Sequence, residues 1–172
     1  HQKGLDLALD AVEPLLDRTQ FVVLGTGDPA LTESFAALAR RHPGVVHFHS
    51  AFDEPFAHRA YAASDIFLMP SRSEPCGLGQ MIAMRYGAVP VVARTGGLAD
   101  TVFEEPSGGR AANGFLCAPN DAASLASALE RCLKAYRGPR WHTLARAAMA
   151  GDFSWDRSVQ SYLSLYRQAA RP

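Results

Sequence analysis

Short apolar runs alternate with helical periodicity along most of the chain. The runs rich in β-branched and aromatic residues have the length of buried strands, and they cover residues 21–24, 45–49, 65–69, 88–92 and 115–117. Elsewhere apolar residues recur every three or four positions, which predicts helices over about 4–17, 29–42, 54–63, 81–85, 95–103, 121–133, 140–149 and 154–166. Apolar strands that alternate with helices favour a parallel sheet covered on both faces, so we predict a Rossmann-like three-layer α/β/α fold.

Polar or glycine-rich segments follow the predicted strands, at residues 25–27, 49–53, 72–79 and 95–97. In a parallel sheet, ligands bind beyond the carboxyl ends of the strands. We therefore expect these segments to line one crevice.

Residues 71–80, SRSEPCGLGQ, lie where a buried strand is followed by a helix. The N-terminus of a helix has unpaired N–H groups and a partial positive charge, which suit a phosphate. Gly77 and Gly79 would let the backbone come close to such a ligand. Glu74 is placed beside the ligand on this interpretation, whereas on the alternative one it only caps a helix entered through Pro75.

Two cationic residues are candidates for binding an anion. Lys3 stands at the N-terminus of a predicted helix, where a cation is disfavoured, so it is a better phosphate candidate than a typical surface lysine. Arg72 could clamp a phosphate through two hydrogen bonds or pair with a neighbouring acid, and the sequence leaves both open.

Residues 25–30, GTGDPA, fit the dinucleotide fingerprint G-x-G-x-x-G/A after a strand. A dinucleotide site also needs an acidic residue at the end of the next strand to hold a ribose, and this strand ends in Phe48-His49-Ser50. We therefore interpret the glycines as a tight turn near the ligand and keep an NAD-type Rossmann oxidoreductase as the alternative. His47 and His49 share one strand face but lack a third metal ligand, so no metal is expected.

Composition narrows the function classes. The 17 Lys and Arg balance the 17 Asp and Glu, which argues against a nucleic-acid partner. Three cysteines without paired spacing predict neither disulfides nor zinc and fit a reducing, cytoplasmic compartment, with Cys76 a small packed thiol. No apolar run has the length of a membrane span, so we expect no membrane partner. The abrupt start, directly before a helical pattern, suggests a fragment of a longer protein.

Several motifs together resemble one family. They are QKGLD at residues 2–6, LGTGD at 24–28, EPCGL at 74–78, RYGAVPVV at 85–92 and RTGGLADTV at 94–102. In this order they resemble bacterial glycogen synthases and plant starch synthases, over nearly the whole chain. The match is to the C-terminal, donor-binding half of a two-domain GT-B glycosyltransferase. Such enzymes transfer glucose from ADP-glucose, or UDP-glucose in some, to an α-1,4-glucan with retention and without a metal.

The resemblance implies roles for individual residues. Lys3 would contact the donor diphosphate, and Glu74 matches the glutamate beside the donor sugar. The backbone at Gly77, Leu78 and Gly79 would receive the distal phosphate, and Phe52 would stack on the base where a tyrosine is common. Gly79 replaces a common threonine, and Ile82 stands where the broader family has a second glutamate, so we assign no second acid. The family's arginine before Lys3 would precede residue 1.

The predicted site thus has two parts. Glu74 and Lys3 are the predicted catalytic residues, and the predicted donor-binding residues are Gly25, Thr26, Gly27, Phe52, Arg72, Gly77, Leu78, Gly79 and Thr95. Residues 1–153 are expected to form the nucleotide-sugar-binding domain. Residues 154–172 are expected to form a helix that crosses back to an N-terminal domain. Its stripe of aromatic and aliphatic residues between Trp155 and Tyr166 could instead be covered by a second copy. A noncatalytic nucleotide-binding module is a further alternative.

Overall fold

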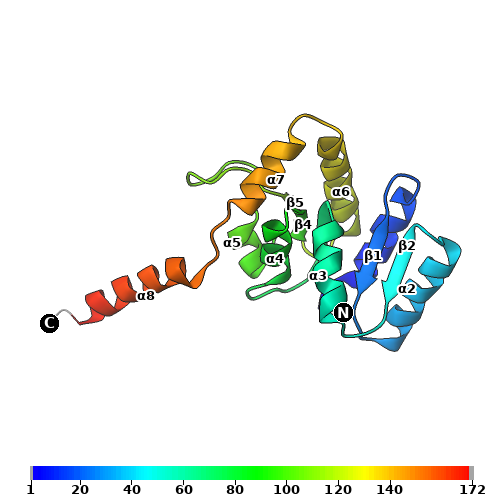
Figure 1. The fold of residues 1–172 in the computed structure, drawn as a ribbon, viewed down its shortest axis with the longest axis horizontal. Helices are drawn as coiled ribbons and strands as arrows, with labels where there is room; N and C mark the ends of the chain where they lie inside the picture. The colour runs from blue at the N-terminus through cyan, green and yellow to red at the C-terminus, as the bar shows by residue number, and fades with distance from the viewer. Residues whose placement is uncertain (1, 171–172) are drawn as a thin grey trace.

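The computed structural model describes residues 2–170, and Figure 1 shows the arrangement of their helices and strands. The strands are β1 (Phe21–Leu24), β2 (Val46–His49), β3 (Ile66–Met69), β4 (Val89–Ala93) and β5 (Phe115–Cys117). The helices are α1 (Leu5–Val12) with a following 3-10 turn (Glu13–Leu15), α2 (Pro29–Arg41), α3 (Glu54–Ala63), α4 (Gly79–Arg85), α5 (Gly96–Thr101), α6 (Ala122–Tyr136), α7 (Trp141–Met149) and α8 (Trp155–Ala169). Each predicted strand and helix is present, with small shifts at the ends.

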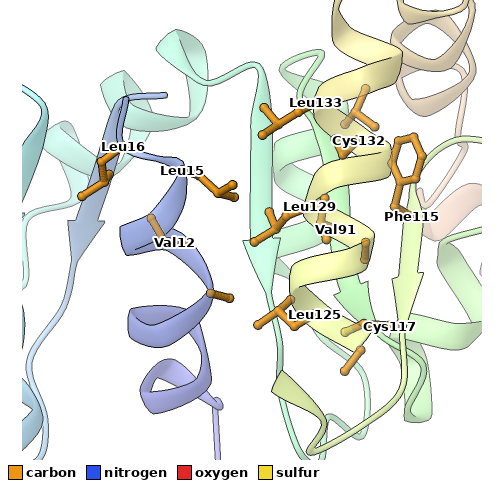
Figure 2. Close-up of a cluster of buried hydrophobic side chains, with 14 of the residues drawn as sticks. Val12, Leu15, Leu16, Val91, Phe115, Cys117, Leu125, Leu129, Cys132 and Leu133 are labelled. Atoms are coloured by element: carbon orange, nitrogen blue, oxygen red, sulfur yellow. The ribbon is translucent and has the colours of Figure 1, made fainter. Parts of the chain in front are cut away.

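All strand pairs are parallel, which confirms the α/β fold class. The strands form two sheets, however, where the sequence predicted one: β1 pairs with β2, and β3, β4 and β5 form the second sheet in that order. Helix α1 lies between β1 and β3 (Figure 2). The residues of β4 are buried throughout, whereas those of β3 are only half-buried. Strand β3 is an edge strand of its sheet and pairs with β4.

The main core lies where α1 and α6 pack together against the second sheet (Figure 2). The residues labelled there are Val12, Leu15, Leu16, Val91, Phe115, Cys117, Leu125, Leu129, Cys132 and Leu133. Burial raises the pKa of Cys117 to about 11 and that of Cys132 to about 12. Both thiols are therefore protonated at neutral pH and serve as small apolar groups.

Side-chain caps fix several helix starts. The carboxylates of Asp28, Asp53 and Asp121 each accept a hydrogen bond from the N–H three residues on, over 2.8–3.0 Å. Ser154 caps α8 in the same way through its hydroxyl oxygen. A cap of this kind is worth about 1 kcal/mol, and it satisfies one of the N–H groups that a helix start leaves unpaired.

Helix α8 has a different environment from the others. It extends away from the body of the molecule (Figure 1), and none of its residues is buried. Trp155, Tyr162 and Tyr166 are each more than half exposed. Within residues 2–170 no helix combines the length and apolar character needed to cross a membrane. The division of the chain at residue 153 remains a prediction.

Candidate functional site

A cavity of about 530 Å³ opens at the carboxyl end of β3. The start of α1, one face of α3 and the turn before α4 complete its wall. Its lining residues are Lys3, Leu5, Tyr61, Phe67, Leu68, Met69, Pro70, Glu74, Gly77, Leu78 and Gly79. The cavity thus brings together both predicted catalytic residues and the predicted phosphate turn, which lie more than 70 residues apart in the sequence.

Glu74 and Lys3 form an ion pair in this cavity. The Lys3 ammonium donates to Oε2 of Glu74, and the Ser71 hydroxyl donates to the same oxygen over 3.2 Å. Only 7% of Glu74 is exposed, whereas the Lys3 side chain is 53% exposed. A buried carboxylate needs such partners. The pair also explains how a cation is tolerated at the start of α1, because Glu74 offsets the unfavourable helix-end potential.

The backbone around Gly4 brings Lys3 to Glu74. Gly4 adopts a left-handed conformation with φ 63°, and a Cβ atom at this position would lie 2.0 Å from the carbonyl oxygen of Pro70. Next to it, the N–H of Arg72 donates to the carbonyl oxygen of Gln2 over 2.9 Å. Only glycine permits both the conformation and the close approach. The start of α1 is therefore held directly against the segment that carries Glu74.

Arg72 reinforces this junction. Its guanidinium donates two hydrogen bonds to the Asp6 carboxylate, over 2.7 and 2.6 Å, and its Nε donates to Asn120 Oδ1 over 2.7 Å. Of the two interpretations that the sequence left open, the structure shows the pairing with an acid. Arg72 does not line the cavity, so its predicted contact with the donor would be indirect: through Asp6 it holds α1, and with it Lys3, in place.

Replacing Asp6 by asparagine tests the junction through its pH dependence. Hydrogen bonding to Arg72 lowers the pKa of Asp6 in the folded state, so the pair stabilises the fold above the unfolded pKa, near 4. That stability is lost as the pH falls through the folded pKa. We expect Asp6→Asn to lower the urea midpoint at pH 6 and to lower it progressively less below pH 4. A midpoint difference that stays constant from pH 6 to pH 3 would contradict this assignment.

The start of α5 packs against the turn that carries Glu74 and precedes α4. The N–H of Gly97 donates to the carbonyl oxygen of Glu74 over 3.0 Å, and a Cβ atom on Gly97 would lie 2.0 Å from the carbonyl oxygen of Cys76. Gln80 lies fully buried beneath the turn and donates from Nε2 to the carbonyl oxygen of Gly77 over 3.0 Å. The sequence analysis gave Gln80 no role and placed Gly97 only in a segment expected to line the crevice. For Gly97 the available signal was the GG pair that begins α5, because adjacent glycines often mark a close backbone approach.

The other predicted donor-binding residues lie outside the cavity lining. Gly25, Thr26 and Gly27 follow β1, Phe52 follows β2 and Thr95 precedes α5. Of the four segments expected to line one crevice, only residues 72–79 contribute to this cavity. Strands β1 and β2 form a sheet of their own, separate from the sheet of β3, whose carboxyl end opens on the cavity. The Phe52 ring is 95% exposed and remains available for stacking.

Cys76 is exposed, so the expectation of a packed thiol is wrong. Its carbonyl oxygen faces α5 at the tight Gly97 contact. His49 pairs with Asp53 over 3.2 Å, and no group of three or more potential metal ligands occurs within residues 2–170.

Comparison with known proteins identifies the family. The model of the family described as "Glycosyl transferases group 1" matches residues 1–135, well over half of the chain. The chain belongs to this family. Membership in the group 1 glycosyltransferases replaces the oxidoreductase alternative.

Individual relatives refine this membership. The chain is 50% identical over 170 residues to a glycogen synthase from Syntrophotalea carbinolica and 47% identical over 169 residues to one from Elusimicrobium minutum. Each match covers 98% of this chain and 35% of the relative, so this group 1 glycosyltransferase chain spans about a third of the length of these relatives. The catalytic domain of starch synthase IV from Arabidopsis thaliana, bound to ADP and acarbose, is 37% identical with a TM-score of 0.86. That match covers 97% of this chain and 36% of the other.

Proposed function

We propose that this chain is the donor-binding half of a retaining glucosyltransferase that moves glucose from ADP-glucose to an α-1,4-glucan in glycogen synthesis. The observation that carries the proposal is the Lys3–Glu74 pair, set beside the Gly77–Gly79 turn in one cavity. Two of the relatives described above are glycogen synthases, which supports the proposed reaction. The ADP in the starch synthase structure supports the nucleotide.

The chemistry requires two kinds of charge stabilisation. Breaking the bond between glucose and the diphosphate leaves negative charge on the departing phosphate and positive charge on the sugar. The Lys3 ammonium and the N–H groups of the turn would stabilise the first, because fixed donors act most strongly where charge develops. The Glu74 carboxylate would orient sugar hydroxyls and stabilise the positive sugar. We favour front-face transfer without a covalent bond to Glu74.

Lys3 can serve both partners at once. An ammonium group has three donor hydrogens, and Glu74 takes one of them. Two donors remain for diphosphate oxygens while the ion pair persists. The pair would therefore hold Lys3 at the junction between leaving group and sugar. No metal ion is needed to supply positive charge in this arrangement, and we propose metal-independent transfer.

The base would stack on Phe52, whose ring is almost fully exposed. A phenylalanine face accepts adenine or uracil, so UDP-glucose is the alternative donor. The turn at Gly25, Thr26 and Gly27 would lie near the donor as well. A Cβ atom on Gly25 or Gly27 would meet no atom within 4 Å, so space for a ligand exists beside both residues.

The glucan would bind to an N-terminal domain that these residues do not include. We propose that α8, with its apolar residues uncovered, packs on that domain or on a second copy of the chain. The isolated chain should then bind donor nucleotide but transfer no glucose. Measurable glucan synthesis by residues 1–172 alone would overturn the proposal that the acceptor binds to a separate domain.

Titration with nucleotides tests the proposed donor site. We expect ADP and ADP-glucose to bind the chain, NAD to bind at least about tenfold more weakly, and EDTA to leave ADP affinity unchanged. Calorimetry gives the affinities, and Lys3→Met should weaken ADP binding. A matched control is Lys134→Met, at an exposed position on α6 away from the cavity. Equal affinities for ADP and NAD would exclude the proposed donor.

A further inference from the structure

Gln80 is a buried polar residue in the first turn of α4. Its exposed fraction is 0%, and its Nε2 donates to the carbonyl oxygen of Gly77 over 3.0 Å and to Thr101 Oγ1 over 3.2 Å. Its Oε1 is buried without a hydrogen-bond partner within residues 2–170. Burying an amide oxygen unpaired costs free energy, on the order of 1–3 kcal/mol. An apolar side chain of the same size would avoid that cost, so the amide is expected to have a role.

The orientation of the amide follows from its neighbours. A rotation by 180° would place Oε1 against the carbonyl oxygen of Gly77, with two acceptors facing each other. The Thr101 hydroxyl could not relieve this, because it donates its hydrogen to the carbonyl oxygen of Gly97 over 2.7 Å. Nε2 therefore faces the carbonyl oxygen of Gly77. The unpaired Oε1 also lies close to Gly77, where a Cβ atom on that residue would approach it to 2.6 Å.

Holding one carbonyl sets the direction of the next N–H. The peptide between Gly77 and Leu78 is planar and trans, so its C=O and N–H point in opposite directions. Because Gln80 draws the Gly77 carbonyl towards the protein interior, the N–H of Leu78 is directed outwards, to the side where Gly77, Leu78 and Gly79 line the cavity. Within residues 2–170 no group accepts a hydrogen bond from this N–H. It is free to donate to a ligand.

We propose that Gln80 is a positioning residue that aims the N–H of Leu78 at a phosphate oxygen of a bound nucleoside diphosphate. The inference rests on the proposed donor site and adds the group that orients its phosphate donor. Thr101 links the same amide to Gly97, whose N–H holds the Glu74 carbonyl. One buried network thus fixes both the phosphate side and the sugar side of the cavity.

The test compares ADP with AMP in Gln80→Met, which keeps the size of the side chain and removes its donor. The chain is titrated with each nucleotide by calorimetry, and the ratio of the AMP to the ADP dissociation constant reports the contribution of the terminal phosphate. We expect Gln80→Met to weaken ADP binding about tenfold and AMP binding less than about threefold, so that the ratio falls. A merely structural role would weaken both nucleotides alike. Gln160→Met, on the exposed α8, is the matched control and should leave the ratio unchanged.

The outcomes separate this inference from the donor site itself. A wild-type chain that does not bind ADP overturns the proposed function. A wild-type chain that prefers ADP, with a folded Gln80→Met variant whose ratio stays within twofold of wild type, overturns the role of Gln80 alone. If Gln80→Met does not fold, Thr101→Val decides, since it removes the contact of Nε2 with Thr101 and leaves those with the Gly77 and Cys76 carbonyl oxygens, so it should lower the ratio to a smaller extent. A folded Thr101→Val variant with an unchanged ratio would then overturn the inference.

Discussion

Replacing Glu74 by glutamine in the full-length enzyme is expected to lower kcat for glucan synthesis by about 10³-fold while ADP affinity changes little. The substitution keeps the size of the side chain and its hydrogen bond with Ser71 but removes the negative charge that faces the sugar. Positive charge develops on the sugar only in the transition state, so the loss should appear in kcat. Initial rates with ADP-glucose and glycogen, together with ADP titration, measure the two effects.

A matched variant separates charge loss at the site from a general effect. Glu105→Gln removes the same charge from the loop after α5, outside the cavity lining, and should keep wild-type rates. If the Glu74→Gln enzyme synthesised glucan at the wild-type rate, Glu74 would have no catalytic role, and the chain would be better described as a noncatalytic nucleotide-binding module. A reduced ADP affinity with unchanged kcat would instead assign Glu74 to holding Lys3.

The local sequence pattern was sufficient to predict the helices and strands. The runs that became β1, β3 and β4 are too apolar for exposed segments, and Asp121 and Ser154 mark helix starts that the structure confirms. The division into two sheets was not predictable, because strand pairing depends on contacts between distant residues. Periodicity reports which face of an element is buried but not which strand lies beside it.

The candidate site was predictable to a similar degree. Motif and helix-end arguments selected Lys3 and Glu74 separately, but their ion pair depends on the left-handed backbone at Gly4, which no local pattern indicates. Arg72 had two equally good interpretations, and only the position of Asp6 across the junction decides between them. Gln80 was missed because a single polar residue in a short amphipathic helix is usually on its exposed face.

Replacing Gly97 by alanine should damage both the fold and the site. The added Cβ atom would lie 2.0 Å from the carbonyl oxygen of Cys76 and within 2.7 Å of two further backbone atoms of that residue. Neither α5 nor the turn can relieve the clash with a side-chain rotation, since all three atoms belong to the backbone. We expect the free energy of unfolding to fall by about 3 kcal/mol or more, as for severe overpacking. Urea denaturation measures this loss.

The same substitution should weaken ADP binding beyond what instability explains. Relief of the clash requires the turn to move away from α5, which breaks the hydrogen bond from the Gly97 N–H to the Glu74 carbonyl and displaces the N–H groups after Gly77. Gly138→Ala is the matched control, because its Cβ atom would meet its nearest neighbour at 3.4 Å, an ordinary contact. That variant should be as stable as wild type or slightly more stable. If Gly97→Ala matched it in stability and in ADP affinity, the turn would not depend on its contact with α5.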